Sequence, residues 1–149
     1  MKALTICQPY PYLILTPQAE LLDGETQKRV ENRTRNMHYR GPLLIHAGLS
    51  RKWLKSHLSL SLETFVFGAI VGIVDVVDCV PFIQDRYGHK KVPFECLPKY
   101  RWLFDHPHAS GEYCIILENP RRFKEPIPYK GKLGLFNVPD ELVKDAVIL

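Results

Sequence analysis

The stretch Phe65–Val80, FVFGAIVGIVDVVDCV, constrains the fold more than any other part of the chain. Valine and isoleucine follow one another almost without interruption, which is typical of a strand in the centre of a sheet. Glycine inside a strand marks a bend or a bulge, and Gly68 and Gly72 interrupt this one. We therefore expect a central strand that bends at one of these two glycines.

Other short runs rich in β-forming residues predict strands around it. We expect six strands in all, at residues 3–7, 28–34, 43–46, 65–80, 111–118 and 132–138. Twelve prolines in 149 residues favour short elements over long helices. Short helical pieces are predicted from Pro9 to Gly24, at 51–58 and at 141–147, and residues 81–110 are predicted to form a long loop with one short helix.

This order of elements indicates an α+β fold, a small mixed β-barrel of about six strands with flanking short helices. A doubly wound α/β sheet fits less well, because helices of about ten residues do not regularly separate the strands. The length predicts a single domain over residues 1–149.

The positive charge of the chain is local. Residues 24–55 contain eight Lys and Arg and two acidic residues, a net charge of +6 in a chain whose total is +4. Along a strand at 28–34, alternation places Arg29, Glu31 and Arg33 on one face, which must meet solvent or line a polar cleft. Lys28 joins that face only from a preceding turn or a bulge, and is otherwise a surface lysine.

Two interpretations of Glu31 and Arg33 stay open. They form an ion pair in a cleft wall, or Arg33 binds a phosphate while Glu31 accepts hydrogen bonds from a base. Both interpretations hold together if Glu31 orients Arg33. Gln8 and Tyr10 leave the first strand at its end, where cleft rims form, and Tyr10 either stacks on a base or packs. With Lys28 and Arg40 of the basic segment, these residues are the candidate ligand-binding set.

The remaining reactive side chains favour structural roles, so we expect no metal and no cofactor. The four cysteines are far apart, without a close ligand pair, and three lie in apolar runs. His46 fits a core histidine, and Trp53 and Trp102 fit core or half-buried positions. No carboxylate or cysteine at ligand spacing accompanies the motif His106-Pro107-His108.

The chain has no apolar run near the ~18 residues that span a bilayer. Pro9 and Pro11 break the apolar N-terminal segment, and no small-residue cleavage site follows it. We therefore predict a cytoplasmic protein without a membrane partner.

Several motifs together resemble the ASCH domain, the activating-signal-cointegrator homology domain. They are ALTICQPY at residues 3–10, Lys28-x-x-Glu31-x-Arg33, YRGPLLIHA at 39–47, GAIVG at 68–72, residues 113–121 and Gly131-x-x-Gly134-Leu135-Phe136-x-Val138. The family's signature Gly-x-Lys-x-x-Glu-x-Arg is matched except that Gly24 precedes Lys28 by four residues instead of two.

The resemblance implies a PUA-like fold, a β-barrel with flanking helices and a cleft, and binding of nucleic acid, RNA above all. Some ASCH-like proteins are N4-acetylcytidine amidohydrolases whose nucleophilic threonine corresponds to Glu31 here, so that mechanism does not carry over. The residues and the resemblance together thus predict a nucleic-acid-binding domain, for RNA before DNA, with a basic cleft that holds a single or modified base. There are two alternatives. The first is a hydrolase that acts on RNA or a modified nucleoside, either a ribonuclease or an amidohydrolase, with Lys28 and Glu31 as acid/base residues. The second is an adaptor for an acidic protein partner.

Overall fold

The computed structural model describes residues 1–54 and 61–149. Within these ranges the chain divides into two compact units. The first unit comprises residues 1–27, 42–75 and 119–149, and the second unit comprises residues 28–41 and 76–118. The prediction of a single domain is not tested by this division and stays a prediction.

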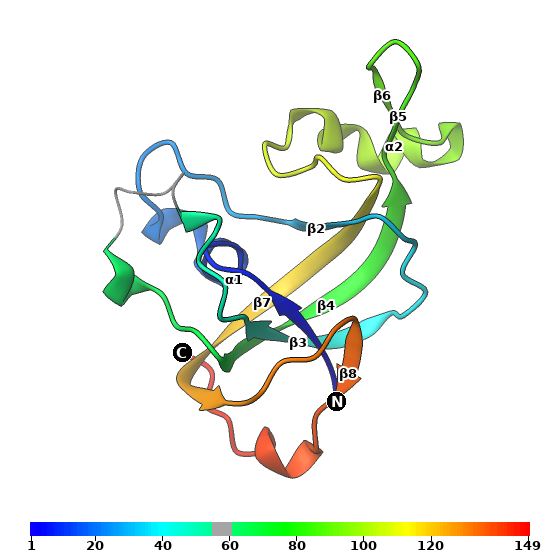
Figure 1. The fold of residues 1–149 in the computed structure, drawn as a ribbon. Coiled ribbons are helices and arrows are strands. Elements are labelled where there is room, and N and C mark those ends of the chain that lie inside the picture. The colour runs from blue at the N-terminus through cyan, green and yellow to red at the C-terminus, as the bar shows by residue number, and fades with distance from the viewer. Residues whose placement is uncertain (55–60) are drawn as a thin grey trace. The chain divides into compact units, whose positions relative to one another are not determined.

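Strands make up most of the regular structure of the described residues, with a few short helices between some of them (Figure 1). They are β1 (Lys2–Ile6), α1 (Tyr10–Leu15), β2 (Val30–Arg33), β3 (Gly41–Ala47), β4 (Ala69–Pro81), β5 (Ile83–Gln84), β6 (Lys90–Lys91), α2 (Leu97–Tyr100), β7 (Tyr113–Pro128) and β8 (Leu135–Asn137). A six-stranded mixed sheet has the order β2-β7-β4-β3-β1-β8, which confirms the α+β prediction and the central position of β4. The order is linear, so within the described residues the sheet does not close into the predicted barrel.

In the first unit, β1 lies between two partners. It pairs in parallel with β3, Ala3 opposite Leu44, and antiparallel with β8, Ala3 opposite Phe136. The core below these strands is apolar throughout. Its buried members are Ala3, Leu44, Ile70, Ile73, Phe123, Phe136, Val138 and Val143. The apolar run predicted at 43–46 is therefore the buried part of β3, with His46 enclosed in it.

The two glycines of the central apolar stretch have different functions. Gly68 precedes β4 with φ +68°, a left-handed conformation that favours glycine. Gly72 lies inside β4, where a Cβ would come within 2.6 Å of the Arg121 carbonyl oxygen and 2.7 Å of a Leu15 methyl group. Gly72 thus permits β7 and α1 to approach the β4 backbone closely.

The predicted end of a strand at Asn119-Pro120 is wrong, because β7 continues through both residues to Pro128. Asn119 adopts φ 50°, a left-handed conformation that asparagine tolerates better than most residues. The strand therefore accommodates Pro120 through a local distortion of its backbone at Asn119. β7 supplies residues to both units.

The second unit contains more structure than its sequence suggested. β2 pairs antiparallel with β7. The hydrophobic core of this unit contains Val30, Val80, Phe82, Val92, Tyr100, Leu103, Cys114 and Ile116. Residues 81–110, predicted as a loop with one short helix, contain the β5–β6 hairpin and α2 with 3₁₀ turns on either side, Phe94–Cys96 and Arg101–Asp105. Val92, Tyr100 and Leu103 anchor this segment in the core although no periodic pattern connects them.

The helical predictions outside this segment had mixed outcomes. The piece after Pro9 is two short elements, α1 and the 3₁₀ turn Gln18–Glu20, as its prolines indicated. The helix predicted at 141–147 is wrong, since only a 3₁₀ turn forms at Asp140–Leu142. The chain then pairs with β7, where the Lys124 amide donates to the Val147 carbonyl at 2.8 Å.

The helix predicted at 51–58 falls partly on residues 55–60, which lie outside the described residues. Trp53, expected in the core or half-buried, is 47% exposed and packs beside Tyr10, so that prediction is wrong. Trp102 is half-buried, as expected. In the described part of the chain, no helix combines the length and the apolar character that membrane crossing requires.

Candidate functional site

The centre of the candidate site is a buried carboxylate in the second unit. Glu31, in β2, is 7% exposed and has a cation on each oxygen. Lys28 Nζ lies 2.6 Å from Oε1, and Arg33 Nη2 lies 2.8 Å from Oε2. The ion-pair interpretation of Glu31 and Arg33 is therefore confirmed.

Lys28 belongs to this cluster because it precedes β2 rather than lying within it. It is 4% exposed, so the alternative of a surface lysine is wrong. Strand alternation applies only from Val30 onward, and the preceding backbone turns the lysine toward Glu31. Two positive charges on one carboxylate leave the cluster with a net positive charge.

Arg33 connects the cluster to a polar cavity. Its side chain is 36% exposed and lines a space of about 510 Å³. The cavity is lined by Asn32, Arg33, Thr34, Ile83, Gln84, Lys90, Ser110, Gly111 and Glu112. Glu31 thus holds the guanidinium of Arg33 at the wall of a cavity whose other residues are mostly polar.

Asn32 also lines the cavity. Its Oδ1 accepts hydrogen bonds from the amides of Ser110 and Gly111 at 3.0 and 2.9 Å, and its Nδ2 donates to the His108 carbonyl at 2.7 Å. Lys90 Nζ donates to the carbonyls of Phe82 and Gly111. These bonds hold the chain from 108 to 111 beside β2 and give the cavity a defined shape.

An aromatic and cationic row lies beside β2 in the same unit. The Arg29 guanidinium is 4.1 Å from the Trp102 ring centre, and the Trp102 ring is 5.5 Å from that of His106. Burial lowers the pKa of His106 from 6.5 to about 4, with smaller contributions from His108, Arg29 and Lys28. His106 is therefore neutral near pH 7, and its Nε2 accepts a hydrogen bond from the Arg29 amide at 3.1 Å.

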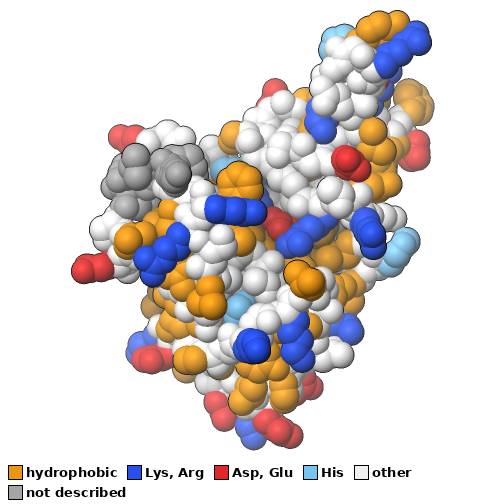
Figure 2. All heavy atoms as spheres, viewed as in Figure 1, with side chains coloured by type: hydrophobic (Ala, Val, Ile, Leu, Met, Phe, Trp, Pro, Cys, Tyr) orange, Lys and Arg blue, Asp and Glu red, His pale blue; other side chains and the backbone are white. Residues whose placement is uncertain are grey.

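Both strands of the β5–β6 hairpin contribute residues to the cavity, and the turn of the hairpin carries a positive charge. Ile83, Gln84 and Lys90 line the cavity, whereas Tyr87, at the turn, is 68% exposed with the Arg86 guanidinium 4.8 Å from its ring centre. At the top of Figure 2, Lys and Arg side chains lie next to hydrophobic ones on this hairpin. Such a pair presents a cation and a flat ring to solvent.

The other predicted site residues lie elsewhere. Arg40, also in the second unit, donates to the carbonyls of Met37 and Tyr39 and lies 3.4 Å from Asp78, so it stabilises its own loop. Gln8 and Tyr10 belong to the first unit. Gln8 is 3% exposed and Tyr10 half-buried.

Of the six predicted residues, the structure brings Lys28, Glu31 and Arg33 together. The cavity residues contributed by the hairpin and by 110–112 were not found from the sequence, because no short motif connects them to β2. Strand alternation puts Asn32 on the face opposite Arg33, yet Asn32 also lines the cavity. His46, in the first unit, is the core histidine predicted, with Nδ1 3.1 Å from Thr5 Oγ1 and Nε2 2.6 Å from the Tyr129 carbonyl oxygen.

In the comparisons with known proteins, no family model matches the chain, and no curated protein is similar enough to count as a relative.

Proposed function

We propose that the chain is an RNA-binding domain of the ASCH family with a PUA-like fold, and that one base of the RNA occupies the polar cavity beside Arg33. The observation that carries this proposal is the buried Glu31 carboxylate, which holds the Arg33 guanidinium at the wall of a cavity of about 510 Å³. The local charge of +6 and the sequence motifs support the same function.

Each group of the site has a function in this proposal. Arg33 binds a backbone phosphate, because a guanidinium offers several donors in a planar fork that matches the geometry of a phosphate. Lys28 holds the Glu31 carboxylate in place through the ion pair at 2.6 Å. The amide and ammonium groups around the cavity then meet the polar edge of an unstacked base, as RNA-binding domains do with single-stranded segments.

The exposed Arg86 and Tyr87 pair provides a surface on which a neighbouring base stacks, a contact of about 1–3 kcal/mol. We place the protein in the cytoplasm, where thiols stay reduced, because its four cysteines are all free.

Fluorescence anisotropy with labelled single-stranded RNA and DNA tests the proposal. Affinity should fall steeply between low and physiological salt, because binding releases counterions from the phosphates. Arg33→Ala should weaken RNA binding by roughly tenfold or more, the effect of losing a charge-assisted hydrogen bond. The matched control, Arg101→Ala, removes an exposed arginine of the same unit that does not line the cavity.

Equal losses in the two variants would indicate diffuse electrostatic contact without a base-binding cavity. No binding to any oligonucleotide at low salt would contradict RNA binding and favour an adaptor function.

One observation favours a second candidate, a hydrolase acting on RNA or a modified nucleoside. Lys28 and Glu31 form a buried pair at 2.6 Å, an arrangement that suits proton transfer as well as structure. The protein is incubated with RNA and with N4-acetylcytidine, and the products are analysed by mass spectrometry. We expect no turnover, and turnover that Glu31→Gln abolishes would make the chain a ribonuclease or an amidohydrolase instead.

A further inference from the structure

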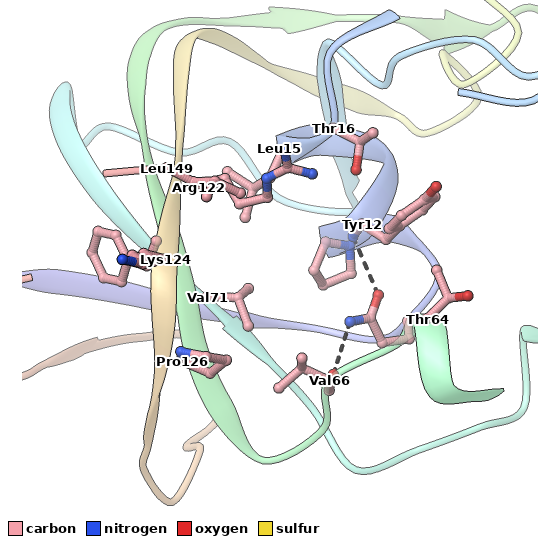
Figure 3. A pocket seen from close by; sticks show the side chains of 13 residues that line it. Tyr12, Leu15, Thr16, Thr64, Val66, Val71, Arg122, Lys124, Pro126 and Leu149 are labelled. Carbon is pink, nitrogen blue, oxygen red and sulfur yellow. Dashed lines mark hydrogen bonds between the residues drawn. The ribbon is translucent and has the colours of Figure 1, made fainter. Parts of the chain in front are cut away.

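The first unit contains a second cavity, of about 350 Å³, which the proposed RNA site does not use. Figure 3 shows it enclosed by side chains from α1, β4, β7 and the connection before β4. Its volume is at the lower end of the range of about 300–1,000 Å³ for small-molecule sites. A ligand there is a small molecule rather than a polymer.

Much of the cavity wall is apolar. Pro11 and Leu15 come from α1, Val71 from β4 and Pro126 from β7 (Figure 3). An apolar body packs against such a wall with a gain of about 25 cal/mol for each Å² removed from water. The wall therefore favours a ligand with a hydrophobic part.

Gln8 lines the cavity, but its side-chain amide nitrogen and oxygen both form hydrogen bonds within the protein. Its Nε2 donates to the Val66 carbonyl at 2.8 Å, and its Oε1 accepts from the Tyr12 amide at 3.2 Å, as the dashed lines in Figure 3 mark. The residue predicted to touch nucleic acid thus connects α1 to the chain before β4.

The charged side chains that line the cavity lie on β7. Arg122 and Lys124 are two residues apart and both line the cavity, whereas no acidic side chain of the described residues does. Arg122 Nη2 is held by Glu20 at 3.0 Å, and its buried Nε has no hydrogen-bond partner among the described residues. A buried donor without a partner is unfavourable, so an acceptor beside Arg122 is stabilising.

We propose that this cavity binds a small amphiphilic anion, an aromatic or aliphatic body that carries one carboxylate or phosphate monoester group. The body packs between Leu15, Val71 and Pro126. The anionic group accepts charge-assisted hydrogen bonds from Arg122 and Lys124, which are stronger than bonds between neutral groups. The inference does not depend on RNA binding.

Isothermal titration calorimetry of the whole chain with three naphthalene compounds tests whether the cavity binds an amphiphilic anion. They are 1-naphthylacetate, 1-naphthyl phosphate and the neutral 2-(1-naphthyl)ethanol. At least one anion should bind, and the alcohol should bind at least about tenfold more weakly, because it lacks the charge. A preference between the two anions identifies the ligand as a carboxylate or as a phosphate monoester.

Three variants locate the site. Lys124→Gln should weaken binding of the preferred anion by roughly fivefold or more, because it removes one charged donor. The control Lys130→Gln changes an exposed lysine of the same unit that does not line the cavity, and should leave binding unchanged. Val71→Phe fills the cavity and should abolish binding, while thermal unfolding verifies that the variant is folded.

Equal binding of the alcohol and the anions, equal effects of Lys124→Gln and Lys130→Gln, or no anion binding at all would overturn the proposal. Binding that persists in a folded Val71→Phe variant would do the same. If Val71→Phe does not fold, the comparison of Lys124→Gln with Lys130→Gln still shows whether the anion binds in this cavity. RNA affinity measured on Lys124→Gln should equal that of the wild type within about twofold, which separates failure of this site from failure of the RNA site.

Discussion

Lys28 Nζ and Arg33 Nη2 lie on opposite oxygens of one buried carboxylate, that of Glu31, at 2.6 and 2.8 Å. Lys28 is itself almost fully buried. Glu31 neutralises the charged ammonium in that position, where an unmatched buried charge would be costly. The cluster is thus a structural requirement of the second unit as well as the support of Arg33.

The first prediction concerns the stability of this cluster. Glu31→Gln should lower the free energy of unfolding by roughly 3–5 kcal/mol, the cost of leaving a buried cation without its counter-ion. Urea unfolding measures the change. The control Glu20→Gln breaks the more exposed pair with Arg122 and should cost about 1 kcal/mol or less.

Adding Lys28→Met to Glu31→Gln should restore part of the stability, because it removes the unmatched charge. A double variant less stable than Glu31→Gln alone would mean that Lys28 contributes independently of Glu31.

The second prediction is a pH dependence caused by His106. Its pKa in the folded chain is about 4, below the ordinary 6.5, chiefly because burial disfavours the charged ring. Between these values the unfolded chain binds a proton that the folded chain does not. The free energy of unfolding should therefore decrease as the pH falls from 6.5 toward 4.

Thermal unfolding across this pH range measures the effect. His106→Gln retains an acceptor for the Arg29 amide and should make the pH dependence shallower. His38→Gln changes an exposed histidine of the same unit and should leave the pH dependence as it is. The interpretation fails if the two variants behave alike.

The third prediction compares two threonines of the first unit. Thr16 is 2% exposed and its Oγ1 has no hydrogen-bond partner among the described residues, whereas Thr5 Oγ1 lies 3.1 Å from Nδ1 of the buried His46. The Tyr129 carbonyl only accepts, so Nε2 of His46 carries the hydrogen and Nδ1 accepts from Thr5.

Thr16→Val, which keeps the shape, should therefore leave the melting temperature unchanged or raise it. Thr5→Val should lower the free energy of unfolding by about 1–3 kcal/mol, because it leaves a buried nitrogen without its donor. Thermal and urea unfolding of both variants decide the matter. A loss in Thr16→Val as large as in Thr5→Val would show that the Thr16 hydroxyl has a stabilising contact.

The structural elements predicted well are those in which neighbouring residues carry the signal. The apolar runs of β3 and β4 predicted buried strands, because a continuous stretch of Val, Ile and Leu is stable only when it is removed from water. The ion pair of Glu31 and Arg33 was one of the two interpretations drawn from the sequence. It could be foreseen because residues two apart on a strand share a face. His46 was predicted to be buried because it is embedded in such a run.

Other features depend on residues far apart in the chain. Burial of Val92, Tyr100 and Leu103 against β2 and β7 orders a segment whose sequence has no period. Pairing with β7 replaces the helix predicted near the C-terminus, because strand hydrogen bonds satisfy the same backbone groups as a helix would.

The sequence alone determined where the six strands of the main sheet lie, though not the full extent of β7 or the β5–β6 hairpin, and that Glu31 and Arg33 share a strand face. Local hydrophobicity and strand alternation are sufficient for both. Only the tertiary structure decided that Lys28 is buried against Glu31, that Asn32 and the hairpin complete a cavity beside Arg33, and that a separate cavity lies under α1. These features arise from contacts between segments distant in sequence, where the free energy depends on burial and charge in three dimensions rather than on neighbouring residues.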